Sequence, residues 1–174
     1  MTFGEAILKA CIIGDFERDS FTKTQYAAVA DQAQKMLAAV TSKIINVYSV
    51  TILDGEAVFI MPPDFKRLIR VKAKNSNAVT DYELTGNRLY LKGDGDYDIC
   101  YEAVPNDINA DTSESYIFEI PSYAHFAIPY YIVYQLLKAT DTETAQASFN
   151  EWNRLMASLD NKPEPSRKLI KNYY

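Results

Sequence analysis

The sequence predicts an α+β protein that is mainly helical: an antiparallel helix bundle with an inserted antiparallel β-sheet and an extended C-terminal tail. Apolar residues recur at helical spacing over 2–41 and 121–160. Between these halves, at about 45–104, short stretches alternate apolar and polar residues and are separated by turns. Residues 162–174 contain two prolines and no stripe long enough for a stable helix. We therefore expect a single domain over 1–161, followed by a tail.

Capping boxes mark the predicted helix starts. In such a box a Thr or Ser side chain and a Glu or Gln three residues later satisfy free amides of the first turn. Thr2 with Glu5, and Thr22 with Gln25, have this spacing, and 140–143 repeats it in the second half. Pro129 starts or kinks the helix between them. The helix after Thr22 is rich in alanine on its apolar face, which allows a neighbouring helix to approach closely.

The inserted sheet is expected to begin with a β-branched strand over 44–53. The pair Asp54-Gly55 follows and favours a hairpin turn. Pro62-Pro63 must interrupt any ladder, because proline has no amide to donate. Strict alternation over 67–72 and 97–102 predicts one face on a core and one facing water or a partner. The polar stretch 105–114 is predicted to be a long linking loop.

Bulk properties are those of an ordinary globular protein. The 174 residues are 48% hydrophobic and 24% charged, and the net charge is -5. No apolar run is long enough to span a bilayer, and the amino terminus lacks a signal-peptide pattern, so we expect no membrane. Cys11 and Cys100 lie far apart and are expected to be buried thiols in a reducing cell.

No cofactor or metal site is predicted. The single histidine, His125, has no obvious partner group and is expected to be structural or at the surface. Asp94, Asp96 and Asp98 alternate around Gly95, but the glutamate of a calcium loop is replaced by Pro105. The same turn lacks the lysine of a phosphate loop. Aromatic strands can stack on bases, but such surfaces are normally basic, so sequence-specific nucleic-acid recognition is not expected.

The order of elements resembles the small head-to-tail adaptor (connector) proteins of tailed bacteriophages. The resemblance rests on 61–71, 96–101 and 128–137: a proline–acid–aromatic step into a strand, a later strand, and a proline-opened aromatic helix. It implies a structural protein without catalytic residues. Copies would form a ring, expected to be dodecameric, that joins the portal protein to stopper or tail proteins, with DNA passing through the lumen. The chain would then lie at the head–tail interface of the virion, and in the bacterial host cytoplasm during assembly.

Two surfaces are predicted to carry this function. The tail places apolar residues among positive charges, which suits binding to an acidic groove of the portal. Its portal-binding residues are Arg167, Lys168, Leu169, Ile170, Lys171, Tyr173 and Tyr174. The alternating strands of the sheet leave a polar, tyrosine-bearing face for contacts between subunits. The residues predicted for these contacts are Arg67, Arg70, Tyr97 and Tyr101.

Two other classes of function remain open at this stage. A monomeric protein-binding module could use an open sheet edge. A carboxylate-based hydrolase, such as a glycosidase, needs only two acids in a cleft.

Overall fold

The computed structural model describes residues 1–41, 44–74 and 81–160. It is 44% helical and 28% strand, with four α-helices and two three-stranded antiparallel sheets in this described part. The prediction of a mainly helical bundle with one inserted sheet is therefore wrong, although the class remains α+β. The helices are α1 (Phe3–Gly14), α2 (Lys23–Val40), α3 (Ile128–Leu137) and α4 (Thr142–Asp160). The strands are β1 (Ile44–Ile52), β2 (Glu56–Ile60), β3 (Phe65–Ala73), β4 (Tyr82–Thr85), β5 (Arg88–Lys92) and β6 (Gly95–Ala103).

Two of the three predicted capping boxes are confirmed. Thr2 caps α1 reciprocally with Glu5, and Thr22 caps α2 with Gln25. At α4 the box is displaced, because Asp141 rather than Thr140 accepts the hydrogen bond from the Thr144 amide, at 3.1 Å. Hydrogen bonds from Thr144 hold the pKa of Asp141 below its usual range. A carboxylate is a stronger acceptor than a hydroxyl at a helix start, and α4 begins one residue after it.

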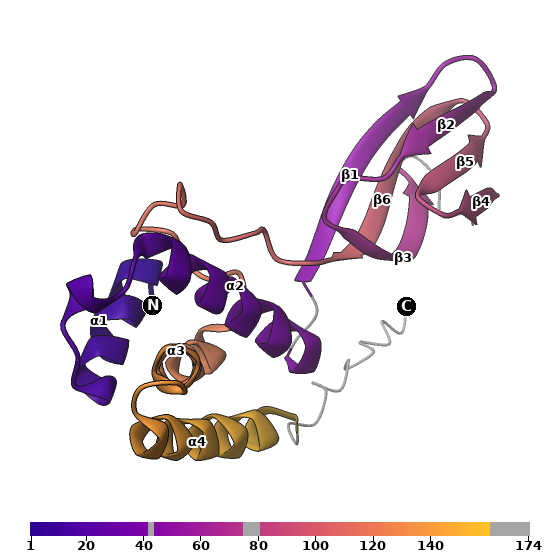
Figure 1. Ribbon diagram of the computed structural model, residues 1–174. Coiled ribbons are helices and arrows are strands. Elements are labelled where there is room, and N and C mark those ends of the chain that lie inside the picture. Colours follow the sequence, from indigo (N-terminus) through magenta and orange to yellow (C-terminus); the bar gives the residue numbers. More distant parts are fainter. Residues whose placement is uncertain (42–43, 75–80, 161–174) are drawn as a thin grey trace, which may run out of the picture.

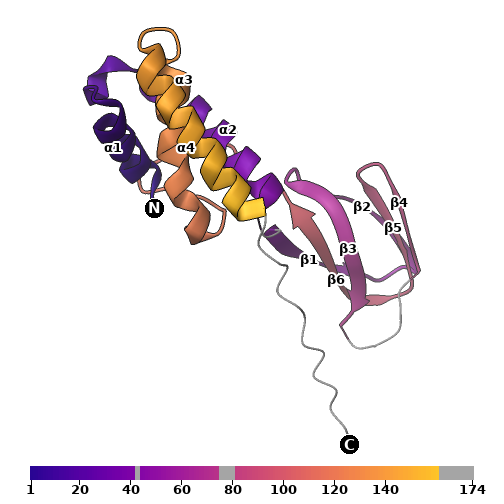
Figure 2. The ribbon, with the colours of Figure 1, turned by 90° about the horizontal axis from the view of Figure 1, so that it is seen from below.

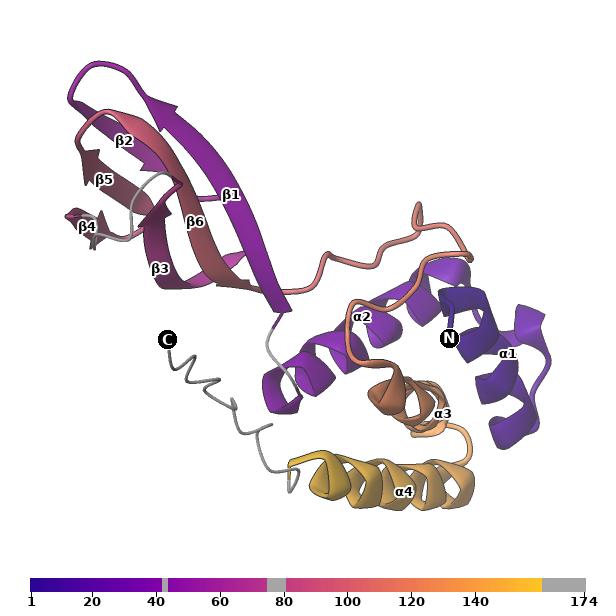
Figure 3. The ribbon, with the colours of Figure 1, turned by 180° about the vertical axis from the view of Figure 1, so that it is seen from behind.

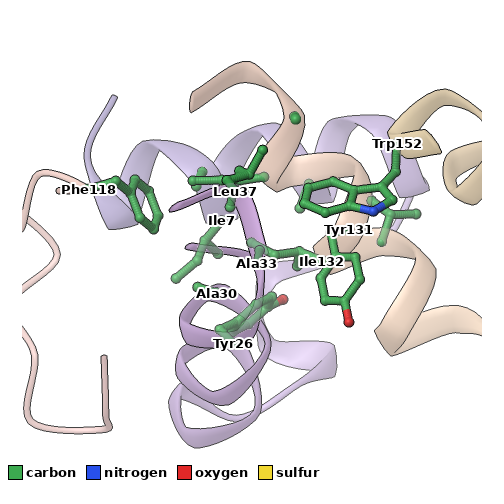
Figure 4. Packing of buried hydrophobic residues seen from close by; sticks show 14 of the residues in the cluster. Ile7, Tyr26, Ala30, Ala33, Leu37, Phe118, Tyr131, Ile132 and Trp152 are labelled. Carbon is green, nitrogen blue, oxygen red and sulfur yellow. The ribbon is translucent and has the colours of Figure 1, made fainter. Parts of the chain in front are cut away.

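The four α-helices form one packed group, which we call the helical unit. Helix α3 lies at its centre, with α1, α2 and α4 packed around it (Figures 1 and 2). Trp152 of α4 lies against Tyr131 of α3, with ring centroids 4.7 Å apart. Ala30 and Ala33 are fully buried, so the small residues of α2 face this core as the sequence predicts (Figure 4). Close approach through alanine maximises the apolar area that each helix removes from water.

A buried side-chain amide of α2, that of Gln34, helps to hold the linking segment 104–121 against this helix. Gln34 has no exposed surface, and its Nε2 donates to the Asn106 carbonyl at 3.1 Å. Its Oε1 accepts from the Glu119 amide at 2.9 Å and from the Tyr116 hydroxyl at 3.2 Å. A buried amide with both ends bonded holds this extended chain in one position.

The two sheets have the orders β1-β6-β3 and β2-β5-β4. The predicted hairpin at Asp54-Gly55 is wrong: Gly55 has a φ of 79°, as a tight turn requires, but β1 pairs with β6 while β2 pairs with β5. The turn therefore carries the chain from one sheet to the other. The turn at Gly86-Asn87, by contrast, joins the paired strands β4 and β5 in a hairpin.

The prediction of strict alternation over 67–72, within β3, is also wrong. Register shifts between Phe65 and Arg67, and between Leu68 and Arg70, insert extra residues into this strand. Leu68 and Val71 consequently oppose Tyr101 and Ile99 of β6 on the inner face. The predicted interruption at Pro62-Pro63 is confirmed, because β2 ends at Ile60 and β3 begins at Phe65.

A second apolar cluster lies between the two sheets and is separate from the helical core. It is centred on fully buried residues of β5 and β6, and its members are Val50, Ile52, Met61, Val71, Leu89, Leu91, Tyr97, Ile99, Tyr101 and Ala103. Figure 2 shows the paired sheets beside the helices. That 1–161 folds as one domain stays a prediction.

Candidate interaction surface

The outer face of the sheet β1-β6-β3 carries a row of basic side chains. We call Arg67, Arg70 and Lys72 of β3 the cationic row. The register places them opposite Glu102, Cys100 and Asp98 of β6, respectively. The bulges of β3 create this row, because they turn Arg67 and Arg70 outward while Leu68 and Val71 turn inward.

Glu102 anchors one end of the cationic row. Its carboxylate is buried and accepts hydrogen bonds from Lys66 at 2.7 Å and from Arg67 at 2.8 Å. The hydrogen bond from Lys66 is the main cause that lowers the pKa of Glu102, and Arg67 adds to it. A buried carboxylate needs such partners, since an unpaired buried charge is strongly destabilising. The charge of Arg67 is therefore partly neutralised by a residue of its own chain.

The other two cations of the row are more available. Arg70 interacts with the Cys100 sulfur, and this hydrogen bond raises the pKa of the guanidinium. Lys72 lies opposite Asp98, but that carboxylate accepts from Ser49 at 2.7 Å and pairs with Lys74 at 3.6 Å. The bond from Ser49 is the main cause that lowers the pKa of Asp98. Among the ion pairs of the described residues, none includes Arg70 or Lys72.

The structure divides the residues predicted for contacts between subunits. Arg67 and Arg70 lie on the outer face, whereas Tyr97 and Tyr101 lie in the cluster between the sheets, 5% and 4% exposed. The Tyr97 hydroxyl donates to the Gly93 carbonyl at 2.9 Å, and the Tyr101 hydroxyl donates to Asp64 at 3.0 Å. Both hydroxyls therefore brace turns of their own chain. The portal-binding residues predicted over 167–174 lie outside the described residues.

We call the two sheets, β1 to β6, the β unit. Asp64, which lies within the stretch that carries the resemblance, joins three parts of this unit. It follows Pro62-Pro63, and its carboxylate also accepts a hydrogen bond from Asn46 of β1 at 2.8 Å. With the Tyr101 hydroxyl on the same group, the turn before β3 is tied to β1 and β6. The proline–acid step thus has a structural task in this chain.

The helical unit carries the opposite charge. Residues 1–41 and 104–160 include six Lys and Arg against thirteen Asp and Glu. Acids gather along the linking segment, where Asp107 pairs with Lys35 and Glu114 pairs with Arg18. The chain therefore presents a cationic row on one unit and an acidic excess on the other.

An apolar groove on the helical unit was missed by sequence reasoning. A cavity of about 370 Å³ opens between α1, α3 and α4. Ile12 at its rim is 80% exposed. No periodicity signals such a groove, because its walls come from three separate helices. Its lining is Lys9, Ile12, Ile13, Phe126, Pro129, Tyr130, Glu151, Arg154 and Leu155.

His125 is buried in the helical unit. Its Nε2 lies 2.8 Å from the Ile120 carbonyl oxygen, and its Nδ1 lies 2.9 Å from the α-amino group of Met1. Burial lowers the pKa of His125, and the nearby amino charge lowers it further. Within the described ranges, no group of three His, Cys, Asp or Glu side chains is placed to hold a metal ion.

We expect the stability of the protein to fall as the pH drops below about 6.5. The lowered pKa means that unfolded His125 binds a proton at a pH where the folded side chain does not. Stability is therefore fully present above the unfolded pKa and declines by up to about 1.4 kcal/mol per pH unit toward the folded pKa. Urea unfolding between pH 7.5 and 5 measures this decline. His125→Gln should flatten it, and equal stability of the wild type across this range would contradict the assignment.

Neither a protein-family model nor a curated protein matches this chain. In the part of the chain that the structure describes, no helix combines the length and the apolar character needed to cross a membrane.

Proposed function

We propose that this chain is a structural protein of tailed bacteriophages that forms a ring between the capsid portal and the stopper or tail proteins. The proposal begins from the resemblance in element order and in 61–71, 96–101 and 128–137. In this role the protein acts through its surfaces, needs no cofactor, and works at the head–tail interface of the virion. DNA passes through the lumen of the ring without being read.

The observation that carries the proposal is the pairing of unlike surfaces. A ring needs a head-to-tail contact, in which one patch of a subunit meets a different patch of the next. The cationic row and the acidic helical unit are two such patches, and Arg70 and Lys72 are the cations with least commitment to their own chain. Opposite charges at such a contact speed association and fix its orientation.

The net charge of the chain also supports the proposed role. With a net charge of -5, the chain as a whole repels phosphates, and a lumen that attracted DNA would slow its transit. The segment 162–174 is the exception, since it has four basic residues and one acid. We propose that this segment contacts the portal, where its apolar residues would supply buried area.

Electron microscopy and mass measurement of the full chain, alone and with portal rings, test the proposal. Arg70→Glu with Lys72→Glu should leave the chain folded, because exposed charges contribute little to stability, but should weaken ring assembly. These positions are preferable to Arg67, since a glutamate there would face buried Glu102. Arg88→Glu with Lys92→Glu is the matched control, with the same change in charge on the exposed face of β5.

Removing residues from 163 onward in the same experiment should abolish portal binding without changing the melting temperature. A chain that never forms rings, with or without portal, would contradict the proposed function. Rings that survive both charge reversals equally would place the contact elsewhere than on the cationic row.

A second candidate, a monomeric protein-binding module, is favoured by the groove between α1, α3 and α4. Its apolar floor with Lys9 and Arg154 at the rim is the form of site that takes a helix or peptide. Persistent monomers that capture a defined protein through Ile12 would support this candidate over the ring.

A further inference from the structure

Strand β1 is an edge strand without the usual protection of an edge. Its nine residues, IINVYSVTI, include no charged residue, proline or glycine. Among the described strands it pairs with β6 alone, so one side of its backbone is open (Figure 3). Ile45 and Val47 are 54% and 59% exposed. A long, uncharged, exposed edge is a template for pairing with another strand.

The other edges of the two sheets are protected. β3 has two bulges and four Lys or Arg residues, which are the devices that keep an edge from pairing. The edges of the second sheet are short, with five residues in β2 and four in β4, and each includes a glutamate. The open edge of β1 is therefore a feature of one strand and not of the whole β unit.

We propose that β1 pairs antiparallel with β1 of a second copy of this chain, about a two-fold axis at Val47. The five consecutive exposed positions of β1, 45–49, are centred on that residue. In this register Val47 opposes Val47, and Ile45 opposes Ser49. The β1-β6-β3 sheets of the two copies then join through their β1 strands into one sheet of six strands.

The residue types of β1 favour a second copy of the same strand as the partner for its open edge. Self-pairing of a strand places each residue type opposite residues of the same strand, so any charge in it would risk meeting a like charge. β1 has none, which makes it fully compatible with its own image. A neighbour's β3 is a poor partner, because its bulges break the ladder and its cations have no acid on β1 to meet. β1 is also the longest unprotected edge that a second copy can offer.

The outer face gives the pair an apolar seam. Ile45 and Val47 project on the side of β1 that also carries Ser49, opposite Glu102, Cys100 and Asp98 of β6. Two-fold pairing brings Ile45 and Val47 of both copies together and covers them. This contact is closed and isologous, unlike the head-to-tail contact of a ring, so the pair belongs to the free chain and does not rest on the proposed function.

A disulfide trap tests the register. In an antiparallel pair, opposing Cα atoms lie about 4.5–5.5 Å apart, which is within reach of a disulfide. In a full chain with Cys11→Ser and Cys100→Ser, the second change being needed because Cys100 lies directly opposite Val47 on β6, Val47→Cys should give a covalent dimer under mild oxidation. Ile69→Cys, an exposed position on β3, is the matched control and should not. Ile45→Cys should link to a chain with Ser49→Cys and not to itself.

Sedimentation of the full chain tests the pairing without cross-links. The wild type should form dimers as its concentration rises to about 100 µM, and Val47→Lys should remain a folded monomer over the same range. Ile69→Lys should remain dimeric. A wild type that is monomeric throughout, a Val47→Lys variant that stays dimeric, or equal cross-linking at positions 47 and 69 would overturn the proposal.

Discussion

Replacing Trp152 by alanine should lower the free energy of unfolding by about 3–5 kcal/mol, the range for large aromatic residues removed from a core. Trp152 is 1% exposed and packs against Tyr131, with ring centroids 4.7 Å apart (Figure 4). Its removal loses the transfer energy of the indole and leaves a cavity between α3 and α4. Chemical denaturation monitored by circular dichroism measures the loss.

Asn153→Ala is the matched control for this variant, because Asn153 is the next residue of α4 and is exposed. It should change stability by no more than about 0.5 kcal/mol. If Trp152→Ala unfolds at the same denaturant concentration as the wild type, the helical core is not centred on α3.

Replacing Leu89 by alanine should cost about 2–5 kcal/mol, and it tests the second apolar cluster. Leu89 is fully buried on β5, the central strand of the second sheet, and its side chain fills the space between the two sheets. A single open sheet in place of the two-layer arrangement would leave this residue in contact with water. Denaturant unfolding of the β unit, followed by near-ultraviolet circular dichroism of its tyrosines, reports the change.

Tyr90→Ala provides the contrast on the same strand. Tyr90 is adjacent to Leu89 but faces away from the cluster and is 36% exposed, so its truncation should cost much less. Equal losses at positions 89 and 90 would show that β5 has no inner face, and the packing of the two sheets would then be wrong.

The two edges of the sheet β1-β6-β3 have different chemistry, and the proposals assign them different tasks. The β3 edge is bulged and cationic, so it resists strand pairing and suits contacts through charge. The β1 edge has no bulge in its register with β6 and no charged residue, so it suits pairing through the backbone. Arg70→Glu with Lys72→Glu, and Val47→Lys, therefore separate ring assembly from pairing of the free chain.

The sequence alone determined the features that depend on neighbouring residues. Thr2 with Glu5, and Thr22 with Gln25, cap their helices because both members of each box lie within one helical turn. Pro62-Pro63 ends a strand because proline lacks a donor, and the turn at Gly86-Asn87 joins strands that are adjacent in the chain.

Only the tertiary structure decided which strands pair and which side chains each layer covers. Asp54-Gly55 has the local signature of a hairpin, yet β1 pairs with β6 and β2 pairs with β5, so neither strand pairs with its neighbour in the chain. Tyr97 and Tyr101 alternate like surface residues, but a second sheet covers them. The bulges of β3, the buried Gln34 and the groove beside Ile12 likewise arise from contacts between distant residues. A local pattern has no information on these contacts, because their energy depends on which surfaces meet after the chain has folded.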